Sequence, residues 1–545
     1  MKMFNHCGVG LGFLLAATAA FATPTVVNTN LQLRLVLDTP TSSTTVRIAK
    51  DPRNNQLYYM KINGDIYQVN LTNSTSARVY SSTDHGLNGS EEGLAIGPDG
   101  TMYVEGDFNT SDGKHAYTII KKGIPNNSGV RVWSQLAQTD NWQKSGGAYD
   151  HNDSALIVSP DGQTLFLNAG SRTDHGEVES NGGTFPNLRD VALTAKIFQL
   201  PTSGTNLFLT NDLPTLLNEG YVFVQGTRNA FDFAYGPNGD MFATENGPDR
   251  DMSDSLYWLR QGCHYGFPWR LGGADNPQQF SNYNPTNDPL LNPIFGAVSG
   301  GLYHNDPTFP PPPTNFTDPI INHGPSADIY RNPTNGAFIN AGATGTSLES
   351  FTAHSSPLGL VFDNAGAVAP PFQYHGFVLR WTPGDPTGDT VAGPFYDASQ
   401  DLLDLNMTKL GTTNYQMYAT TIVSGFSNPI DSEIISNKIY VVEYGGNQGL
   451  WEITFPPAPG PAPAAVIVNV SLSGANVIIQ ATNGVANGTY YTLKSPNWSL
   501  PLAQWTSVET NVLGATLNAT GSFTFTVTNG FNPANPSEFF ILLTP

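Results

Sequence analysis

The feature that most constrains the fold of this 545-residue chain is a recurring strand–turn–strand pattern. In each copy an apolar strand leads into a tight turn such as Pro-Asp-Gly or Asn-Gly, and a second apolar strand follows. The clearest copies are GLAIGPDGTMYV (93–104), ALIVSPDGQTLFL (155–167) and FDFAYGPNGDMFA (231–243). Because these turn residues tolerate the backbone angles that tight hairpins require, each copy predicts a β-hairpin.

Three looser copies bring the number of predicted hairpins to six. They cover residues 46–60, 359–367 and 430–443. The copies recur at intervals of roughly 40 to 130 residues, which is too uneven for a WD40 or kelch array. One hairpin per blade predicts a six-bladed β-propeller with long loops between some of its blades.

The composition favours an all-β fold and excludes several classes of function. Only 12% of residues are charged, whereas 11% are aromatic, and the chain contains 55 Gly and 41 Pro, as expected for short strands and tight turns. A net charge of −20 argues against nucleic acid as a partner. Two cysteines, Cys7 and Cys263, provide neither a disulfide framework nor a thiolate metal site. No CxxCH motif is present for attaching a c-type haem.

The first 22 residues have the pattern of a secretory signal peptide. Lys2 precedes an apolar stretch at residues 8–19, and Ala20-Phe21-Ala22 matches an A-x-A cleavage site. The apolar stretch is too short to span a membrane. We therefore expect a periplasmic or extracellular protein without a membrane span.

Composition also marks the predicted domain boundaries. A Pro-, Asn- and Gly-rich insertion at about 270–350 is expected to lie over one propeller face, the alternative being a solvent loop without a role. PPAPGPAPAA at 456–465 predicts a stiff, extended linker, and five strand-like segments follow it. The predicted domains are a signal peptide (1–22), a six-bladed β-propeller (30–457) and, after the linker, a small C-terminal β-sandwich module of immunoglobulin-like type (466–545).

The candidate site residues are those that come just before the predicted hairpins, because the loops that open the innermost strands surround the mouth of a propeller channel. Before four of the hairpins stand Asn88 with Glu91 and Glu92, Tyr149-Asp150-His151, Thr227-Arg228-Asn229 and His354-Ser355-Ser356. A single residue of this kind more often has a structural role than a functional one. His151, Arg228 and His354 at matched positions of separate blades point instead to one shared site.

The stretch after the fourth hairpin, TENGPDRDMSDSLYWLRQGCHYGFPWR (244–270), carries the most specific motif. It resembles the glucose/sorbosone dehydrogenases, which are soluble propellers that use pyrroloquinoline quinone (PQQ). That family has a Glu-x-Gly-Pro segment, an Asp-Glu pair and Gly-x-Asn-Tyr-Gly-Trp-Pro. The matching residues are Glu245, Gly247, Pro248, Asp254, Gly262, Tyr265, Gly266 and Pro268, whereas Phe267 replaces the usual Trp and Ser255 the usual Glu. The resemblance extends to the Arg-Asn pair, to His151 and to HSSPLGLVF (354–362), and it spans residues of about 40–455.

The resemblance implies catalytic roles for the residues before the hairpins. His151 is expected to be the general base that takes the hydroxyl proton of the substrate while a hydride passes to the quinone. Asp150 is expected to orient the His151 ring. Arg228 is expected to face the quinone oxygen that gains charge, with Asn229 bonded to the cofactor and His354 on the substrate rim.

The resemblance also implies a Ca²⁺ ion that joins the protein to the cofactor. The main-chain carbonyls of Gly247 and Pro248 are the expected ligands, with Asp254 as a third, since oxygen ligands suit this hard ion. A purely structural Ca²⁺ loop formed by Asp249, Asp251 and Asp254, or a solvated acidic turn without any ion, are the alternatives.

The anchoring of the PQQ carboxylates departs from the family pattern. The family uses Lys and Arg from the last two blades, but the final blade here reads Gly-Phe-Ser-Asn-Pro (425–429), without an arginine. Arg172 and Arg380 are the predicted substitutes. Asn88, near a position that the family often fills with Gln, is a further expected cofactor contact.

These observations lead to one main prediction and two alternatives. The main prediction is a secreted dehydrogenase that uses PQQ and Ca²⁺ to oxidise a sugar or polyol and passes electrons to an external acceptor. The first alternative is a lactonase-like propeller hydrolase, in which Ca²⁺ polarises a carbonyl and His151 activates water. The second is a non-catalytic glycan-binding propeller whose C-terminal module contacts the cell surface.

Overall fold

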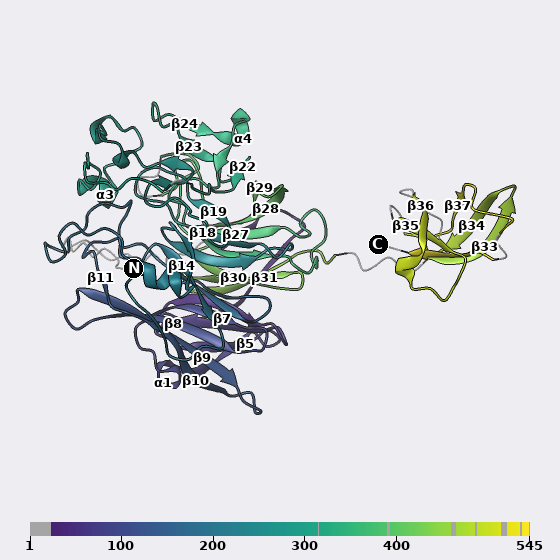
Figure 1. Ribbon diagram of the computed structural model, residues 1–545, viewed down its shortest axis with the longest axis horizontal. Helices are drawn as coiled ribbons and strands as arrows, with labels where there is room; N and C mark the ends of the chain where they lie inside the picture. Colours follow the sequence, from purple (N-terminus) through teal and green to yellow (C-terminus); the bar gives the residue numbers. More distant parts are fainter. Residues whose placement is uncertain are drawn as a thin grey trace, which may run out of the picture. The chain divides into compact units, whose positions relative to one another are not determined.

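The computed structural model describes residues 23–313, 315–389, 393–458, 465–485, 488–513, 520–534 and 537–543. The predicted signal peptide lies outside these ranges. The chain divides into two compact units, residues 1–457 and 458–545. Both consist mainly of strands, which confirms the predicted all-β class (Figure 1). The longest described helix, α2 (Leu213–Asn218), has 6 residues, and no helix in these ranges is long and apolar enough to cross a membrane.

Within the described part of the first unit, six mainly antiparallel sheets of three or more strands follow one another along the chain. The first contains β3 (Thr45–Asp51), β4 (Gln56–Lys61), β5 (Ile66–Asn70) and β6 (Thr75–Tyr80), after which comes α1 (Ser82–His85). The second contains β7 (Ser90–Ile96), β8 (Met102–Asn109), β9 (His115–Pro125) and β10 (Arg131–Thr139), with β11 (Trp142–Gln143) and β15 (Leu207–Leu209) added. The third contains β12 (Leu156–Val158), β13 (Thr164–Ala169), β14 (Lys196–Pro201) and β16 (Val222–Gln225).

The remaining three sheets complete the first unit. The fourth contains β17 (Ala230–Tyr235), β18 (Met241–Glu245) and β19 (Ser255–Leu259). The fifth contains β26 (Pro357–Phe362), β27 (Gly376–Arg380), β28 (Asp401–Leu410) and β29 (Asn414–Ser424), with β1 (Thr25–Val26), β22 (Ile321–Asn322) and β25 (Leu348–Glu349) added. The sixth contains β30 (Pro429–Ile435), β31 (Lys438–Glu443), β32 (Gly449–Thr454) and β2 (Gln32–Asp38).

The six sheets are arranged in a closed ring. The first strand of each sheet contacts the first strand of the next, and β30 of the sixth sheet contacts β3 of the first. Strand β2, near the N-terminus of the unit, pairs with β32, so segments from both ends of the unit contribute to one sheet. Buried apolar side chains fill the spaces between the sheets, as Phe242 and Trp258 of the fourth sheet do with Leu360 and Leu403 of the fifth.

Buried carboxylates also join neighbouring sheets. Asp232 on β17 accepts a hydrogen bond of 2.7 Å from the Leu360 N–H on β26. Asp431 on β30 accepts one of 2.8 Å from the Ile48 N–H on β3. Asp153, just before β12, accepts from the Thr118 hydroxyl on β9 at 2.7 Å. Burial raises the pKa of Asp232 to about 6 and that of Asp153 to about 7, because it disfavours the charged form.

A long insertion separates the fourth and fifth sheets, and in Figure 1 much of it lies at the top of the unit. Its elements are β20 (Arg270–Leu271), β21 (Ala274–Asp275), η1 (Pro277–Gln279), η2 (Pro285–Asn287), α3 (Gly296–Ser299), β23 (Ile329–Arg331), β24 (Phe338–Asn340) and α4 (Ala341–Thr344). The Asp251 N–H donates to the Leu290 carbonyl at 3.0 Å, so the insertion contacts the loop that follows β18.

The described part of the second unit contains two three-stranded sheets. One comprises β33 (Val466–Ser473), β34 (Asn476–Thr482) and β37 (Phe523–Val527). The other comprises β35 (Thr489–Ser495), β36 (Thr506–Val512) and β38 (Phe539–Leu543), and the short η3 (Leu502–Gln504) precedes β36. Ile479 and Phe525 from the first sheet and Leu542 from the second belong to one apolar core.

Because each unit has its own apolar core, we expect limited digestion with a broad-specificity protease to cut near residues 456–465. Both fragments should stay folded, and the melting temperature of the larger fragment should lie within about 2 °C of its transition in the intact chain. Mass spectrometry and calorimetry measure the two quantities. One cooperative transition for the whole chain, together with a linker that resists cleavage, would contradict this division.

The raised pKa of Asp153 makes a pH-dependent contribution to stability. The folded state retains the Asp153 proton above the pH at which the unfolded chain releases it, so this contribution is complete below pH of about 4 and is lost as pH rises through about 7. The Asp153→Asn variant should therefore gain at least about 2 °C in melting temperature relative to wild type between pH 5 and pH 8. Asp112, whose pKa hydrogen bonds lower, is the control, since Asp112→Asn should show no such drift. A constant difference for Asp153→Asn would refute the assignment.

Candidate functional site

The candidate site residues that precede the third and fourth hairpins, His151 and Arg228 among them, lie side by side. The His151 N–H donates to the Ser171 carbonyl at 3.0 Å, and the Ser171 N–H donates to the Arg228 carbonyl at 2.7 Å. The Asn246 N–H donates to the Asn229 carbonyl at 3.2 Å. These main-chain bonds join the loops around β12, β13, β17 and β18, and they bring His151 and Arg228 to one place.

The His151 ring has one fixed and one free nitrogen. Its Nδ1 lies 2.8 Å from the Ser171 carbonyl oxygen, which accepts hydrogen bonds only, so Nδ1 carries the hydrogen and Nε2 has the lone pair. No side chain or main-chain group of the described residues bonds to Nε2. Burial and the neighbouring Arg228 lower the pKa of His151 to about 3. The imidazole is therefore neutral at physiological pH and can accept a proton at Nε2.

Asp150 does not orient this ring, contrary to our expectation. Its carboxylate accepts from the Ser145 N–H at 2.6 Å and from the Gly146 N–H at 3.3 Å, and it thereby fixes the turn that precedes it. The carbonyl of Ser171 orients His151 instead. Sequence adjacency was misleading here, because consecutive side chains on an extended segment point in different directions.

Arg228 is buried and held from three directions. Its Nε donates to the Asp174 carbonyl at 2.7 Å, Nη2 donates to Asp174 Oδ1 at 2.9 Å, and Nη1 donates to the Asn246 carbonyl at 3.1 Å. Of the five guanidinium N–H groups, these bonds leave one on each Nη without a partner among the described residues. The neighbouring Asn229 is half-buried, and within the described ranges its side-chain amide also has no partner.

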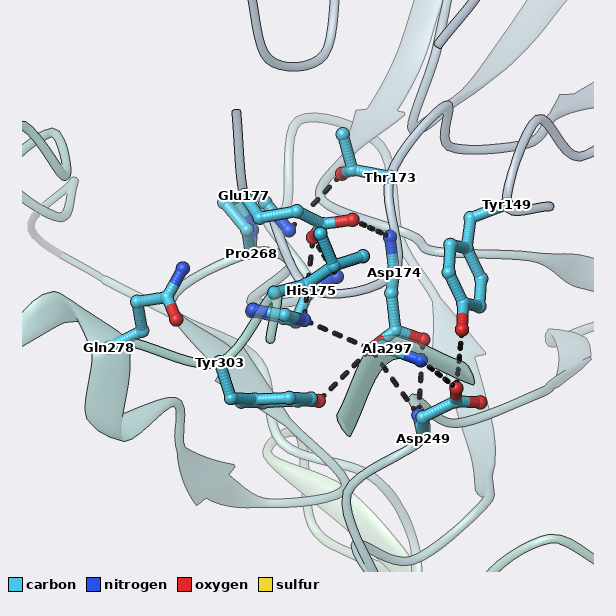
Figure 2. Close-up of polar contacts among 12 residues, drawn as sticks. Tyr149, Thr173, Asp174, His175, Glu177, Asp249, Pro268, Gln278, Ala297 and Tyr303 are labelled. Carbon is cyan, nitrogen blue, oxygen red and sulfur yellow. Dashed lines mark hydrogen bonds and ion pairs between the residues drawn. The ribbon is translucent and has the colours of Figure 1, made fainter. Parts of the chain in front are cut away.

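Asp174 is the central residue of this site, and the sequence analysis did not identify it (Figure 2). Besides Arg228, its fully buried carboxylate accepts from His175 Nδ1 at 2.9 Å, from the Tyr303 hydroxyl at 3.0 Å and from the Asp249 N–H at 3.0 Å. These donors hold the pKa of Asp174 well below its ordinary value despite its burial. The run Arg-Thr-Asp-His-Gly-Glu (172–177), directly after a predicted hairpin, was the available signal.

His175 is a second buried imidazole with a very different environment. Besides Asp174, a Glu177 oxygen lies 3.3 Å from its Nδ1. Its ring stacks on Tyr303, with a centroid distance of 3.7 Å and an angle of 13° between the planes. The two carboxylates outweigh the cost of burial and raise the pKa of His175, in contrast to that of His151.

The insertion covers the loop that follows β18. Asp249 Oδ2 accepts from the Tyr149 hydroxyl at 2.5 Å and from the Ala297 N–H at the start of α3 at 2.8 Å (Figure 2). Together with the bond between Tyr303 and Asp174, these contacts place part of the insertion against the loops that carry His151 and Arg228. This agrees with the predicted position of the insertion over a loop face.

The predicted metal ligands divide into two groups. Asp254 is buried, and its carboxylate accepts from the N–H groups of Gly247 at 2.6 Å and Ser356 at 2.8 Å, and from the Ser355 hydroxyl at 3.1 Å. It therefore ties two loops together, and its assignment as a ligand stays a prediction. The carbonyl oxygens of Gly247 and Pro248 accept no hydrogen bond from described residues, so this pair suits a hard cation. In the described part of the chain no three His, Cys, Asp or Glu side chains converge as a metal site.

His354 lies at the edge where the insertion meets the fifth sheet. Its Nε2 lies 2.7 Å from Asp251 Oδ1, and its ring stacks on Phe295 of the insertion with a centroid distance of 4.1 Å. Asp251 also forms an ion pair with Arg331, in which Arg331 Nε lies 2.7 Å from Asp251 Oδ2. The predicted rim residue is thus joined to the insertion by ring contact with Phe295 and, through Asp251, by way of Arg331.

The predicted anchors for the quinone carboxylates are used elsewhere, which corrects both assignments. Arg172 is fully buried and donates only to main-chain carbonyls, at 2.7–3.1 Å. Arg380 is buried between Asp397 and Asp401 and donates to both carboxylates. Asn88 is exposed, and no side-chain bond joins it to the described residues.

No protein-family profile and no curated protein matches the chain. Among solved structures, it is similar to the PQQ-bound aldose sugar dehydrogenase of Streptomyces coelicolor, at 15% identity and a TM-score of 0.45, over 80% of this chain and 98% of that one. It is similar to the apo form of the soluble aldose sugar dehydrogenase of Escherichia coli, at 15% identity and a TM-score of 0.45, over 78% of this chain and 100% of that one. It is also similar to the PQQ domain of a pyranose dehydrogenase of Coprinopsis cinerea, at 12% identity and a TM-score of 0.47, over 79% of this chain and 97% of that one. All three of these proteins are sugar dehydrogenases.

Proposed function

We propose that residues 30–457 form a six-bladed β-propeller and that the protein is a secreted dehydrogenase that oxidises a sugar or polyol with PQQ and Ca²⁺. The C-terminal module (466–545) is a β-sandwich without a catalytic role, and electrons pass to an external acceptor. The observation that carries the proposal is the His151 imidazole, which is neutral, fixed at Nδ1 and free at Nε2 beside the buried guanidinium of Arg228.

His151 is suited to the proton transfer in alcohol oxidation. An alcohol loses a proton from its hydroxyl and a hydride from its carbon, so the protein needs a base that is unprotonated at working pH. The free Nε2 of His151 accepts the hydroxyl proton, and the Ser171 carbonyl stabilises the imidazolium through Nδ1–H. PQQ, when bound, is the acceptor of the hydride.

Three features of the site fit PQQ and its cation. The two free N–H groups of Arg228 and the free amide of Asn229 are donors for quinone oxygens. The unbonded carbonyls of Gly247 and Pro248 are the ligands for Ca²⁺. Because Arg172 and Arg380 are committed elsewhere, Ca²⁺ and Arg228 supply the positive charge at this position.

The lactonase-like hydrolase is the second candidate. The observation that favours it is the commitment of Arg172 and Arg380 to other partners, since a hydrolase needs no anchor for a tricarboxylate. Titration of the Ca²⁺-loaded protein with PQQ separates the two candidates. Stoichiometric binding seen in the quinone absorbance, followed by reduction of a dye with aldose, supports the dehydrogenase, whereas lactone hydrolysis without quinone binding supports the hydrolase.

Replacing His151 with alanine should lower turnover without loss of the fold, because the ring acts as a base rather than as packing. We expect the kcat for dye reduction to fall by at least ~10²-fold in His151→Ala, with PQQ affinity and melting temperature nearly unchanged. His304→Ala, which removes an exposed imidazole of the insertion, is the matched control. If the activity of His151→Ala per folded molecule stays within threefold of wild type, His151 is not the general base.

Removing Ca²⁺ should affect both stability and quinone binding, because the Gly247 and Pro248 carbonyls connect the loop to the cofactor through the ion. Treatment with EGTA should lower the melting temperature by several degrees and abolish PQQ binding, and added Ca²⁺ should restore both. Thermal melts and absorbance titrations of the same samples provide the test. If chelation lowers stability but leaves PQQ binding intact, the ion is structural and its cofactor role is wrong.

A further inference from the structure

Arg228 and the insertion meet at a single carboxylate, that of Asp174. Oδ1 of Asp174 accepts from Arg228 Nη2, and Oδ2 accepts from the Tyr303 hydroxyl and from His175 Nδ1. Asp174 and His175 are fully buried, and Arg228 and Tyr303 are each only 4% exposed. Water therefore cannot substitute for any of these partners without opening the site.

The bonds to Asp174 determine which N–H groups of Arg228 remain available. A guanidinium is planar and its five N–H directions are fixed relative to one another. Asp174 takes two of them, through its main-chain carbonyl at Nε and through its carboxylate at Nη2. Fixing these two directions fixes the plane of the group and the directions of its two free N–H groups.

Tyr303 in turn fixes Asp174. Its hydroxyl lies 3.0 Å from Oδ2, and its ring covers the face of His175, the other side chain that donates to Oδ2. The Asp249 N–H, from the loop beneath α3, completes the set of donors. A change in the position of the insertion therefore changes the donors to Asp174 before it affects Arg228.

We propose that Asp174 is a positioning residue for Arg228, and that the insertion, through the Tyr303 hydroxyl, is a working part of the site. The catalytic use of Arg228 rests on the proposed function, whereas the positioning itself does not. Asp174 acts through Arg228 and touches no reacting atom.

The positioning is tested on the apo protein by the reactivity of Arg228 toward phenylglyoxal, followed residue by residue with mass spectrometry. Asp174→Asn removes the charge and keeps the size, and Tyr303→Phe removes only the hydroxyl. Tyr283→Phe is the matched control, because its hydroxyl bonds a carboxylate of the same insertion, Asp288, at 2.9 Å, away from Asp174. Arg78, whose side chain is 55% exposed, is the internal reference for reagent activity.

We expect labelling of Arg228 to be slow in wild type, at least tenfold faster in Asp174→Asn and at least threefold faster in Tyr303→Phe. It should be unchanged in Tyr283→Phe, and labelling of Arg78 should be equal in all variants. Equal labelling of Arg228 in wild type and Tyr303→Phe overturns the role of the insertion, and this variant decides the test if Asp174→Asn does not fold. Equal labelling in a folded Asp174→Asn overturns the positioning role.

A kinetic cycle adds a readout that simple destabilisation does not move. Asp174→Asn should lower the kcat for dye reduction at least tenfold in wild type but less than twofold in an Arg228→Lys background, because its effect passes through Arg228. Equal losses in both backgrounds overturn the proposal. A wild-type protein that neither binds PQQ nor reduces dye refutes the proposed function, and the labelling result then still decides the positioning.

Discussion

The structure of the first unit depends on the pairing of β2 with β32. This pairing makes the sixth sheet from both ends of the unit, and it lets β30 contact β3, so every sheet has two neighbours. A ring of sheets has no exposed inner edge and needs no covalent link, which suits a chain with two cysteines. The ring also gathers the starts of six inner strands around one axis. Residues more than 200 positions apart, such as His151 and His354, thereby come to loops of the same face.

The insertion shields the loops on one face of the ring from water. Loops at the mouth of a channel are open to water, and charges in water interact weakly. Contacts of the insertion with Asp249 and Asp174 bury the Arg228–Asp174 pair. Electrostatic interactions are stronger in such a buried environment than in water. Two imidazoles within this region consequently have opposite pKa shifts. His151, which is buried and next to the cation Arg228, is neutral, whereas His175, between two carboxylates, favours its protonated form.

The parts of this structure that were predictable are those encoded locally. Turn chemistry located five of the six inner hairpins, whereas the pattern at 359–367 covers β26 but ends before its partner β27 begins at Gly376. Position before a hairpin identified His151 and Arg228 as neighbours. The partners of charged side chains were not predictable in this way. Arg172 and Arg380 looked available in the sequence, but each is fully buried, and long-range packing supplies its acceptors. Asp174 was missed for the same reason, since three of its four donors, Arg228, the Asp249 N–H and Tyr303, come from segments far from it in the sequence.

The charge distribution around the site bears on what it can bind. Arg228 is matched by Asp174, and Asp249 lies close by, so the site without an added cation is not strongly positive. A polyanionic ligand would find little net attraction here unless a divalent ion accompanied it. The carbonyls of Gly247 and Pro248 are where such an ion adds positive charge without neutralising a protein carboxylate. Cation and anionic cofactor would therefore bind cooperatively, each weakly alone, whereas a neutral lactone would gain much less from the ion. The coupling between the two binding events, rather than either affinity, is thus the property that distinguishes a quinone site from a hydrolytic one in this fold.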